Sequence, residues 1–217
     1  MKKAIGQAVM GVAVAIALAI PSVSFAQSRG GPRMFVEARH TAVNRLLQVN
    51  AAAGSAQATQ RDGQVTRILN TMLDLEELSR RALEPYWAER TATEKQEFTG
   101  LLRQLIERNY RQNLNQSLAW GVTYEPEQID EAQGTAVVRT VARSRTDARA
   151  APVTIEYRLH RRGANDWVVY DIVTNGSSLV QTYHDSYTRI IRERGFAELM
   201  NRLRTRVQSQ GTTNNPA

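Results

Sequence analysis

The histidines of this 217-residue chain, which are the side chains most suited to acid–base and metal chemistry at neutral pH, are few and far apart. Its three histidines, His40, His160 and His184, stand in no metal-binding motif, and the sequence has no cysteine. Zinc sites need several such ligands at short, regular spacings, so no metal centre is expected. The sequence also contains no glycine-rich phosphate loop and no GxSxG elbow. Nucleotide chemistry and serine hydrolysis therefore find no support, and we expect no cofactor.

Asp171 is the one carboxylate placed where burial could change its chemistry. It lies within the apolar run 167–173, and a desolvated carboxyl has a raised pKa, as in small-barrel isomerases that use an aspartate base. However, no partner acid or oxyanion donor can be identified beside it. We favour the simpler interpretation, in which Asp171 accepts hydrogen bonds from the backbone or an arginine. An enzyme that uses Asp171 as a general base remains the alternative.

The N-terminus has the form of a secretory signal. Lys2 and Lys3 precede an apolar run over residues 4–20, and Ser24-Phe25-Ala26 has small residues at its first and third positions, as a cleavage site requires. We predict a signal peptide over 1–26, cleaved after Ala26, with an uncleaved membrane anchor as the alternative. A flexible linker is expected over 27–33, one domain over 34–207 and a disordered polar tail over 208–217.

Composition narrows the class of protein further. The formal net charge is +7, but the arginines are spread along the chain and do not interleave with aromatic residues, so nucleic-acid binding is not expected. An exported chain without cysteine must be held together by its core, which is typical of bacterial exported proteins. It also has no cysteine to carry a lipid. We therefore expect a freely diffusing monomer in the periplasm.

The first part of the chain has helical periodicity. Apolar residues recur at helical spacing from Val36 to Leu47, from Val65 to Met72 and from Leu75 to Ala82, with Asp74 as an N-cap and Pro85 after the third helix. The fourth helix is the clearest. Thr93 and Gln96 fit a capping box there, and the apolar face contains Phe98, Leu101, Leu102, Leu105, Ile106 and Tyr110.

After Gly121 the period changes to two, which predicts strands. Residues 122–130 and 135–145 are expected to be neighbours, and 153–173 to form a hairpin around the turn RRGAND. Strict alternation places Val168, Tyr170 and Ile172 on one face of the last strand and Trp167, Val169 and Val173 on the other. Two helices with apolar stripes follow, before and after Gly195. The fold class is therefore α+β, with a curved antiparallel sheet packed against helices.

The stretch DWVVYDIVTNGSSLVQTYHDSYTRII (166–191) carries more apolar surface than a half-exposed strand and helix need. A central strand is apolar on both faces in any case, so a filled core explains it as well as a ligand pocket. From periodicity alone we favour a filled core over a ligand pocket.

Residues 166–204 resemble the C-terminal signature of the MlaC, or toluene-tolerance, family of periplasmic phospholipid-binding proteins. The matching residues are Trp167, Tyr170, Asp171, Gly176, Ser178, Leu179, Tyr183, Tyr187, Ile190, Ile191, Gly195 and Phe196. Residues 75–110 are also similar, with Tyr86-Trp87, the helix start at Thr93 to Phe98, and Tyr110; residues 155–159 (IEYRL) fall at a family strand. The resemblance covers roughly residues 34 to 205. One departure is Glu84-Pro85, where the family more often has a glycine.

The resemblance implies a nuclear-transport-factor-like fold whose curved sheet and helices enclose an apolar cavity for phospholipid acyl chains. It implies a carrier and no enzyme, one that shuttles glycerophospholipids between membranes and helps to maintain outer-membrane lipid asymmetry. The implied partners are an outer-membrane lipoprotein–porin complex and an inner-membrane ABC transporter with a lipid-binding ring, for which this chain would be an auxiliary component.

On that basis the candidate lipid-binding residues come from three segments. They are Leu105, Ile106 and Tyr110 from the fourth helix, Ile155, Tyr157, Leu159, Val169 and Ile172 from the hairpin, and Leu179, Tyr183 and Ile190 from the fifth helix. Alternation alone does not decide whether Val169 or Ile172 turns inward. A third reading, an interaction module with a filled core and no cavity, also stays open.

Overall fold

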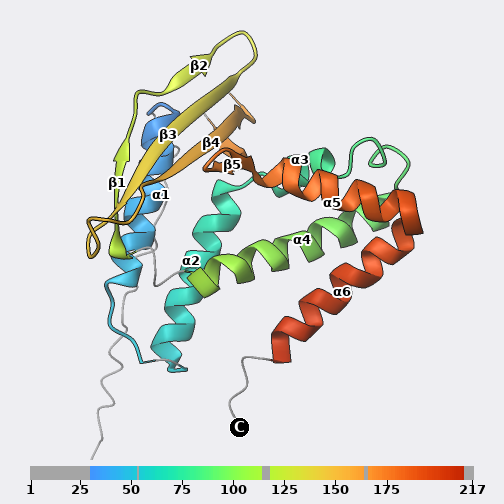
Figure 1. Ribbon diagram of the computed structural model, residues 1–217, viewed down its shortest axis with the longest axis horizontal. Coiled ribbons are helices and arrows are strands. Elements are labelled where there is room, and N and C mark those ends of the chain that lie inside the picture. The colour runs from blue at the N-terminus through green and yellow to red at the C-terminus, as the bar shows by residue number, and fades with distance from the viewer. Residues whose placement is uncertain (1–29, 53, 114–117, 164–165, 213–217) are drawn as a thin grey trace, which may run out of the picture.

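The computed structural model describes residues 30–52, 54–113, 118–163 and 166–212. The expected signal peptide, residues 1–26, lies outside these ranges. Within them, no helix is both long enough and apolar enough to cross a membrane. The fold is α+β as expected, with an open antiparallel sheet of six strands packed against helices (Figure 1).

In the described ranges, four helices precede the sheet and two follow it: α1 (Pro32–Leu47), α2 (Ala56–Met72), α3 (Leu75–Ala82), α4 (Ala92–Asn113), α5 (Leu179–Arg194) and α6 (Phe196–Thr212). The helix α1 begins at Pro32, inside the segment expected to be a linker, because proline suits the first turn of a helix. At the other end, α6 continues to Thr212, into the segment expected to be a polar tail.

Side chains fix where several helices begin. Asp74 caps α3 as predicted, since its carboxylate accepts a hydrogen bond from the Glu77 N–H. The capping box of α4 was predicted two residues too late. The Thr91 hydroxyl accepts from the Glu94 N–H at 3.2 Å, and the Glu94 carboxylate accepts from the Thr91 N–H at 2.8 Å. Thr91 and Glu94 have the same spacing as Thr93 and Gln96, so sequence spacing alone could not separate the two pairs.

The strands are β1 (Trp120–Tyr124), β2 (Gln128–Asp130), β3 (Thr135–Ser144), β4 (Val153–Arg161), β5 (Trp167–Thr174) and β6 (Ser177–Ser178). Their order in the sheet is β1-β3-β4-β5-β6, and β2 also pairs with β3. The pairing of β1 and β2 with β3 confirms that residues 122–130 lie beside 135–145. The antiparallel pair β4–β5 confirms the predicted hairpin.

The strict alternation predicted for β5 is wrong because the β4–β5 register shifts between Arg158 and Leu159. Followed along β5, Val169 pairs with Leu159 before the shift, and Ile172 pairs with Tyr157 after it. An extra residue in one strand moves the following side chains to the other face. Val169 and Ile172 therefore share one face of the sheet, and the opposite face carries Val168, Asp171 and Val173.

The face of the sheet that carries Tyr157, Leu159 and Val169 is covered by α1 and the end of α2 (Figure 1). We call it the inner face. Together these elements form the first of three apolar clusters: Phe35, Val36, Met72, Leu73, Leu75, Ala136, Val138, Tyr157, Leu159, Trp167 and Val169. On the outer face, Glu156 forms ion pairs with Arg139 at 2.9 Å and with Arg158 at 3.0 Å.

The second cluster joins α3, α4, α5 and α6 and contains Leu78, Ala82, Leu83, Phe98, Leu101, Leu102, Leu105, Tyr187, Leu199, Met200 and Leu203. It confirms the predicted apolar stripes of the last two helices. The third cluster joins α1 and α2 through Val43, Leu47, Val65 and Ile68. The buried core is thus divided into separate parts, and Ile106 of α4 packs against both the first and the second.

Both edges of the sheet are short or interrupted. On one side, β1 and β2 form a single edge, separated by residues 125–127, with exposed Glu125 and Pro126. On the other side, β6 pairs with the end of β5, and Leu73 makes a parallel bridge to Val169 nearer its start. The Asp74 N–H donates to the Val169 carbonyl at 2.8 Å, which ties the α2–α3 connection to β5.

Candidate apolar ligand site

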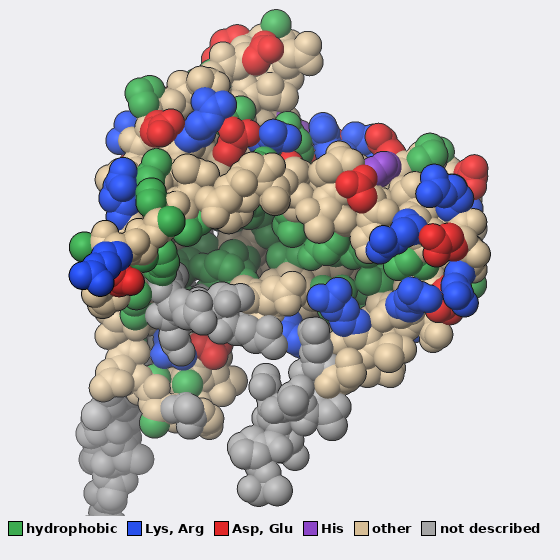
Figure 2. Space-filling model, in the orientation of Figure 1, with side chains coloured by type: hydrophobic (Ala, Val, Ile, Leu, Met, Phe, Trp, Pro, Cys, Tyr) green, Lys and Arg blue, Asp and Glu red, His purple; other side chains and the backbone are tan. Residues whose placement is uncertain are grey.

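A hollow lined by hydrophobic side chains opens in one face of the molecule (Figure 2). It runs between the sheet and the helices α4 and α5, and basic side chains stand along its lower rim, over α6. The hollow lies where the first and second apolar clusters face each other. An apolar concavity of this kind takes ligands with extended hydrocarbon surface.

The strand residues predicted to contact lipid all lie on the inner face of the sheet. Ile155, Tyr157 and Leu159 alternate along β4, and the register of β5 brings both Val169 and Ile172 beside them. The structure therefore answers the question that alternation left open, since both β5 residues turn inward. Ile155 and Ile172 are partly buried at the border of the first cluster.

The helix residues predicted to contact lipid lie mainly in the second cluster. Leu105 is 3% exposed, whereas Leu179, Tyr183 and Ile190 of α5 are partly buried against it. Ile106 connects this group to the sheet, because it packs against both clusters. Tyr110 lies apart from them, against the third cluster between α1 and α2.

Burial separates these residues into two groups. Leu159 and Val169 are 0% exposed, and Leu105 and Tyr157 are also buried, so these four serve as packed core. Free apolar surface is found on the partly buried residues, which are Ile106, Ile155, Ile172, Leu179, Tyr183 and Ile190. These six are the better candidates for ligand contact. Val180, Ile191 and Val207, which we did not single out as candidates, are partly buried against the same second cluster.

A partly buried polar group on the inner face could not be identified from the sequence. The imidazole of His40 lies between two tyrosines, with Nδ1 at 2.6 Å from the Tyr124 hydroxyl and Nε2 at 2.8 Å from the Tyr157 hydroxyl. Burial lowers the pKa of His40 to about 4 and raises that of Tyr124 to about 12. The imidazole is thus neutral, donating one hydrogen bond and accepting the other. Because His40 is 84 and 117 residues from these partners, no local pattern could reveal the contact.

Asp171 points away from the hollow. It lies on the outer face, is 2% exposed, and accepts hydrogen bonds from the Ser178 hydroxyl at 2.7 Å and the Val180 N–H at 3.0 Å. Arg158 is a third partner at 3.4 Å. These contacts join β5 to the start of α5, as the simpler interpretation predicted. They do not support Asp171 as a general base in the apolar hollow.

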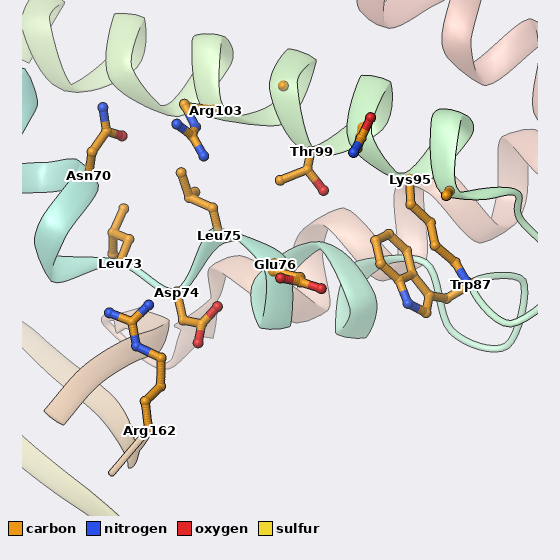
Figure 3. Close-up of a pocket in the computed structure, with 13 residues that line it drawn as sticks. Asn70, Leu73, Asp74, Leu75, Glu76, Trp87, Lys95, Thr99, Arg103 and Arg162 are labelled. Atoms are coloured by element: carbon orange, nitrogen blue, oxygen red, sulfur yellow. The ribbon is translucent and has the colours of Figure 1, made fainter. Parts of the chain in front are cut away.

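A separate groove of about 670 Å³ lies between α3 and α4 (Figure 3). Leu73, Leu75 and Trp87 form its apolar part, and Lys95 places its ammonium 5.4 Å from the centre of the Trp87 ring. Charged and amide side chains line the rest: Asn70, Asp74, Glu76, Gln96, Arg103 and Arg162. Such a lining suits a polar ligand and would leave acyl chains in contact with charges.

Comparison with known proteins agrees with the fold. A structure described as the phospholipid-binding protein from Ralstonia solanacearum in complex with a phospholipid is similar to this chain, with a TM-score of 0.69 and 21% identity. The alignment covers 84% of this chain and 99% of that one. The curated proteins contain no significant match. The profile of the MlaC protein family matches residues 37–205, most of the sequence. The chain belongs to the MlaC family.

Proposed function

We propose that this protein is a periplasmic phospholipid carrier. The observation that carries the proposal is the apolar hollow, which is bordered by partly buried hydrophobic residues from the sheet, α4 and α5. Membership of the MlaC family supports it, as does the likeness to a protein described as binding a phospholipid. The acyl chains would occupy the hollow and the head group would stay near its mouth.

The energetics of crossing water explain why a carrier needs such a hollow. Two acyl chains contain roughly 30 methylenes, each worth about 0.8 kcal/mol on leaving water. Exposure of both chains would therefore cost on the order of 20 kcal/mol. Transfer from a bilayer to an apolar hollow exchanges one hydrocarbon environment for another. The net free energy can then be small, and the relative affinities of the partner proteins would set the direction of transport.

The carrier would move glycerophospholipids between the two membranes of the envelope and help to keep the outer membrane asymmetric. Its partners would be an outer-membrane lipoprotein–porin complex and an inner-membrane ABC transporter with a lipid-binding ring. In the first 26 residues, basic residues are followed by an apolar run and then by small residues, and this order supports export. A chain without cysteine cannot carry a thioether-linked lipid.

The proposed carrier has no enzymatic activity. The three hydrogen-bond partners of Asp171 hold its carboxylate on the outer face. The described residues contain no group of three or more potential metal ligands. Chemistry at the apolar hollow would thus need a group other than Asp171.

Native mass spectrometry of protein purified from a bacterial periplasm tests the proposal directly. The expected result is a mass increment that equals one or more phospholipids, with the same lipids found by solvent extraction. An apo mass from gently handled protein, which also takes up no lipid from vesicles, would reject the carrier function. It would favour the interaction module with a filled core.

A further inference from the structure

Two tyrosines of α5 form a parallel pair within the second apolar cluster. The ring centres of Tyr183 and Tyr187 are 5.4 Å apart and their planes differ by 8°. The pair is one helical turn apart, and Phe98 of α4 packs edge-on against Tyr187 at 5.7 Å. Because the rings are parallel and start from the same face of α5, their hydroxyl groups lie on the same side. The packing therefore holds two hydrogen-bond donors next to each other.

These hydroxyls have no hydrogen-bond partner among the described residues. Burial raises the pKa of both phenols, so the groups are shielded from bulk water. Yet neither oxygen is among the fully enclosed side-chain polar atoms of the described residues that lack a hydrogen bond. Tyr187 is 5% exposed and Tyr183 is partly buried, so the rings belong to the packed core, whereas both oxygens retain accessible surface. A donor in that position is stabilised by any acceptor that reaches it.

Arg206 is a basic residue near the pair. It is an exposed residue of α6, which packs alongside α5, and its guanidinium lies close enough to lower the pKa of both tyrosines. Arg206 has no carboxylate partner among the described residues, in contrast to Arg202 and Arg204 of the same helix, which pair with Glu198 and Glu97. Apolar side chains, two hydroxyls and a guanidinium without a carboxylate partner are therefore neighbours on α5 and α6.

A glycerophospholipid has a complementary set of groups, with acyl chains, ester carbonyls and a phosphate. We propose that Tyr183 and Tyr187 donate hydrogen bonds to the ester carbonyl oxygens of the bound lipid and that Arg206 binds its phosphate. This inference rests on the proposed carrier function and adds to it a fixed orientation. The acyl chains extend toward Ile106 and Ile172, and the head group lies beside α6.

The pair makes the ester linkage itself a recognition element. A dialkyl ether lipid of the same chain length has the same hydrocarbon and phosphate but no carbonyl. Each neutral hydrogen bond changes affinity by roughly fivefold, so two should favour the ester lipid by about tenfold or more. Exchange of both tyrosines for phenylalanine keeps the rings and their stacking and removes only the donors.

The experiment compares binding of diester and diether phosphatidylglycerol with identical saturated chains to the full-length mature protein. Wild-type protein should prefer the diester, and the double variant Tyr183→Phe/Tyr187→Phe should bind both lipids equally. The matched control is Tyr170→Phe, which also removes a partly buried hydroxyl without a described partner, but its ring packs against Arg81 and His160, beside Asp171 and away from the hollow. It should keep the wild-type preference.

Each outcome decides between the proposals. Equal binding of both lipids by wild-type protein would overturn the tyrosine inference and leave the carrier function intact. A preference that survives in the double variant would do the same. Binding of neither lipid would reject the carrier function itself. Loss of the preference in Tyr170→Phe as well would show that hydroxyl loss acts through general packing, and the assignment to the pair would fail.

Arg206 is tested with phosphatidylglycerol and the diacylglycerol of the same chains. The wild-type preference for the phosphate-bearing lipid should fall roughly tenfold in Arg206→Gln, since a charge-assisted contact is lost. It should persist in Arg202→Gln, whose guanidinium is already held by Glu198. An unchanged preference in Arg206→Gln would remove this residue from the head-group site. Displacement of the lipid by inorganic phosphate would indicate a free-anion site and overturn the assignment.

Discussion

The imidazole Nε2 of His40 lies 2.8 Å from the hydroxyl oxygen of Tyr157 and so connects α1 to the central strand β4. The second ring nitrogen contacts Tyr124 of the edge strand β1. A neutral imidazole satisfies both tyrosines, whereas a protonated one would need two acceptors and a counter-charge. This polar bridge within an apolar layer therefore makes the attachment of α1 to the sheet sensitive to pH.

The stability of the protein should fall in acid because of His40. Its pKa is about 4 in the folded protein, below the ordinary value of 6.5, so the unfolded chain binds a proton first as the pH decreases. Above pH 6.5 the imidazole is neutral in both the folded and the unfolded chain, so the free energy of unfolding does not change with its protonation. Between pH 6.5 and 4 its contribution to the free energy of unfolding is lost progressively, by about 2 kcal/mol at pH 5. Urea unfolding of wild type and His40→Gln across this range measures the effect. Identical pH dependence in both proteins would contradict it.

Introduction of a charge at Ile155 should abolish lipid loading. Ile155 is partly buried on the inner face of β4, whereas its neighbour Thr154 is exposed on the outer face. Ile155→Glu would place a carboxylate among acyl chains, and the affinity should fall by roughly a hundredfold or more. Thr154→Glu is the matched control and should load normally. Both variants are checked for native circular dichroism before lipid extraction. Normal loading of folded Ile155→Glu would remove this residue from the site.

Exchange of Asp171 for asparagine should reduce stability and leave lipid binding intact. The buried carboxylate accepts from Ser178 and Val180 at the start of α5 and pairs with Arg158, and an amide replaces these contacts poorly. A loss of about 2 kcal/mol in the free energy of unfolding is expected. Chemical denaturation and lipid extraction of the same preparation give both quantities. Loss of lipid from a folded Asp171→Asn protein would reopen a functional role for the carboxylate.

Asp74 should contribute more stability than its exposed neighbour Glu76. One carboxylate oxygen of Asp74 caps α3, and the other lies 3.0 Å from His160 Nε2. The backbone N–H of Asp74 donates to the Val169 carbonyl of β5. Asp74→Ala removes the first two contacts and should cost about 1 to 2 kcal/mol. Glu76→Ala changes the charge equally on the same turn and should cost little. Thermal unfolding of the two variants tests the difference, and equal losses would refute it.

The elements whose apolar residues repeat regularly could be predicted from the sequence. The apolar stripe from Phe98 to Leu105 indicates the buried face of α4, and the alternation from Ile155 to Leu159 indicates the buried face of β4, because the period of apolar residues follows burial. The fold class and most of the inward candidate residues follow from such stripes and from family resemblance.

The features that depend on tertiary contacts could not be predicted. The register shift opposite Arg158 reverses Ile172 and Val173, and no composition signal marks it, since the run from Trp167 to Val173 is apolar on either reading. The same limit applies to His40, whose partners are distant in the chain. Periodicity also cannot distinguish a filled core from a wall with free surface, which is why Leu159 and Ile172 looked equivalent.

The interrupted edges of the sheet have a consequence for how this protein behaves in a crowded compartment. An open sheet is at risk of self-association by strand addition, the route by which sheets grow into fibrils. At one edge, Pro126 breaks the line between β1 and β2, and the exposed Glu125 adds a like charge against any second copy. At the other, the two-residue β6 and the bridge from Leu73 occupy β5. The fold can thus keep an apolar interior accessible without offering a template for aggregation.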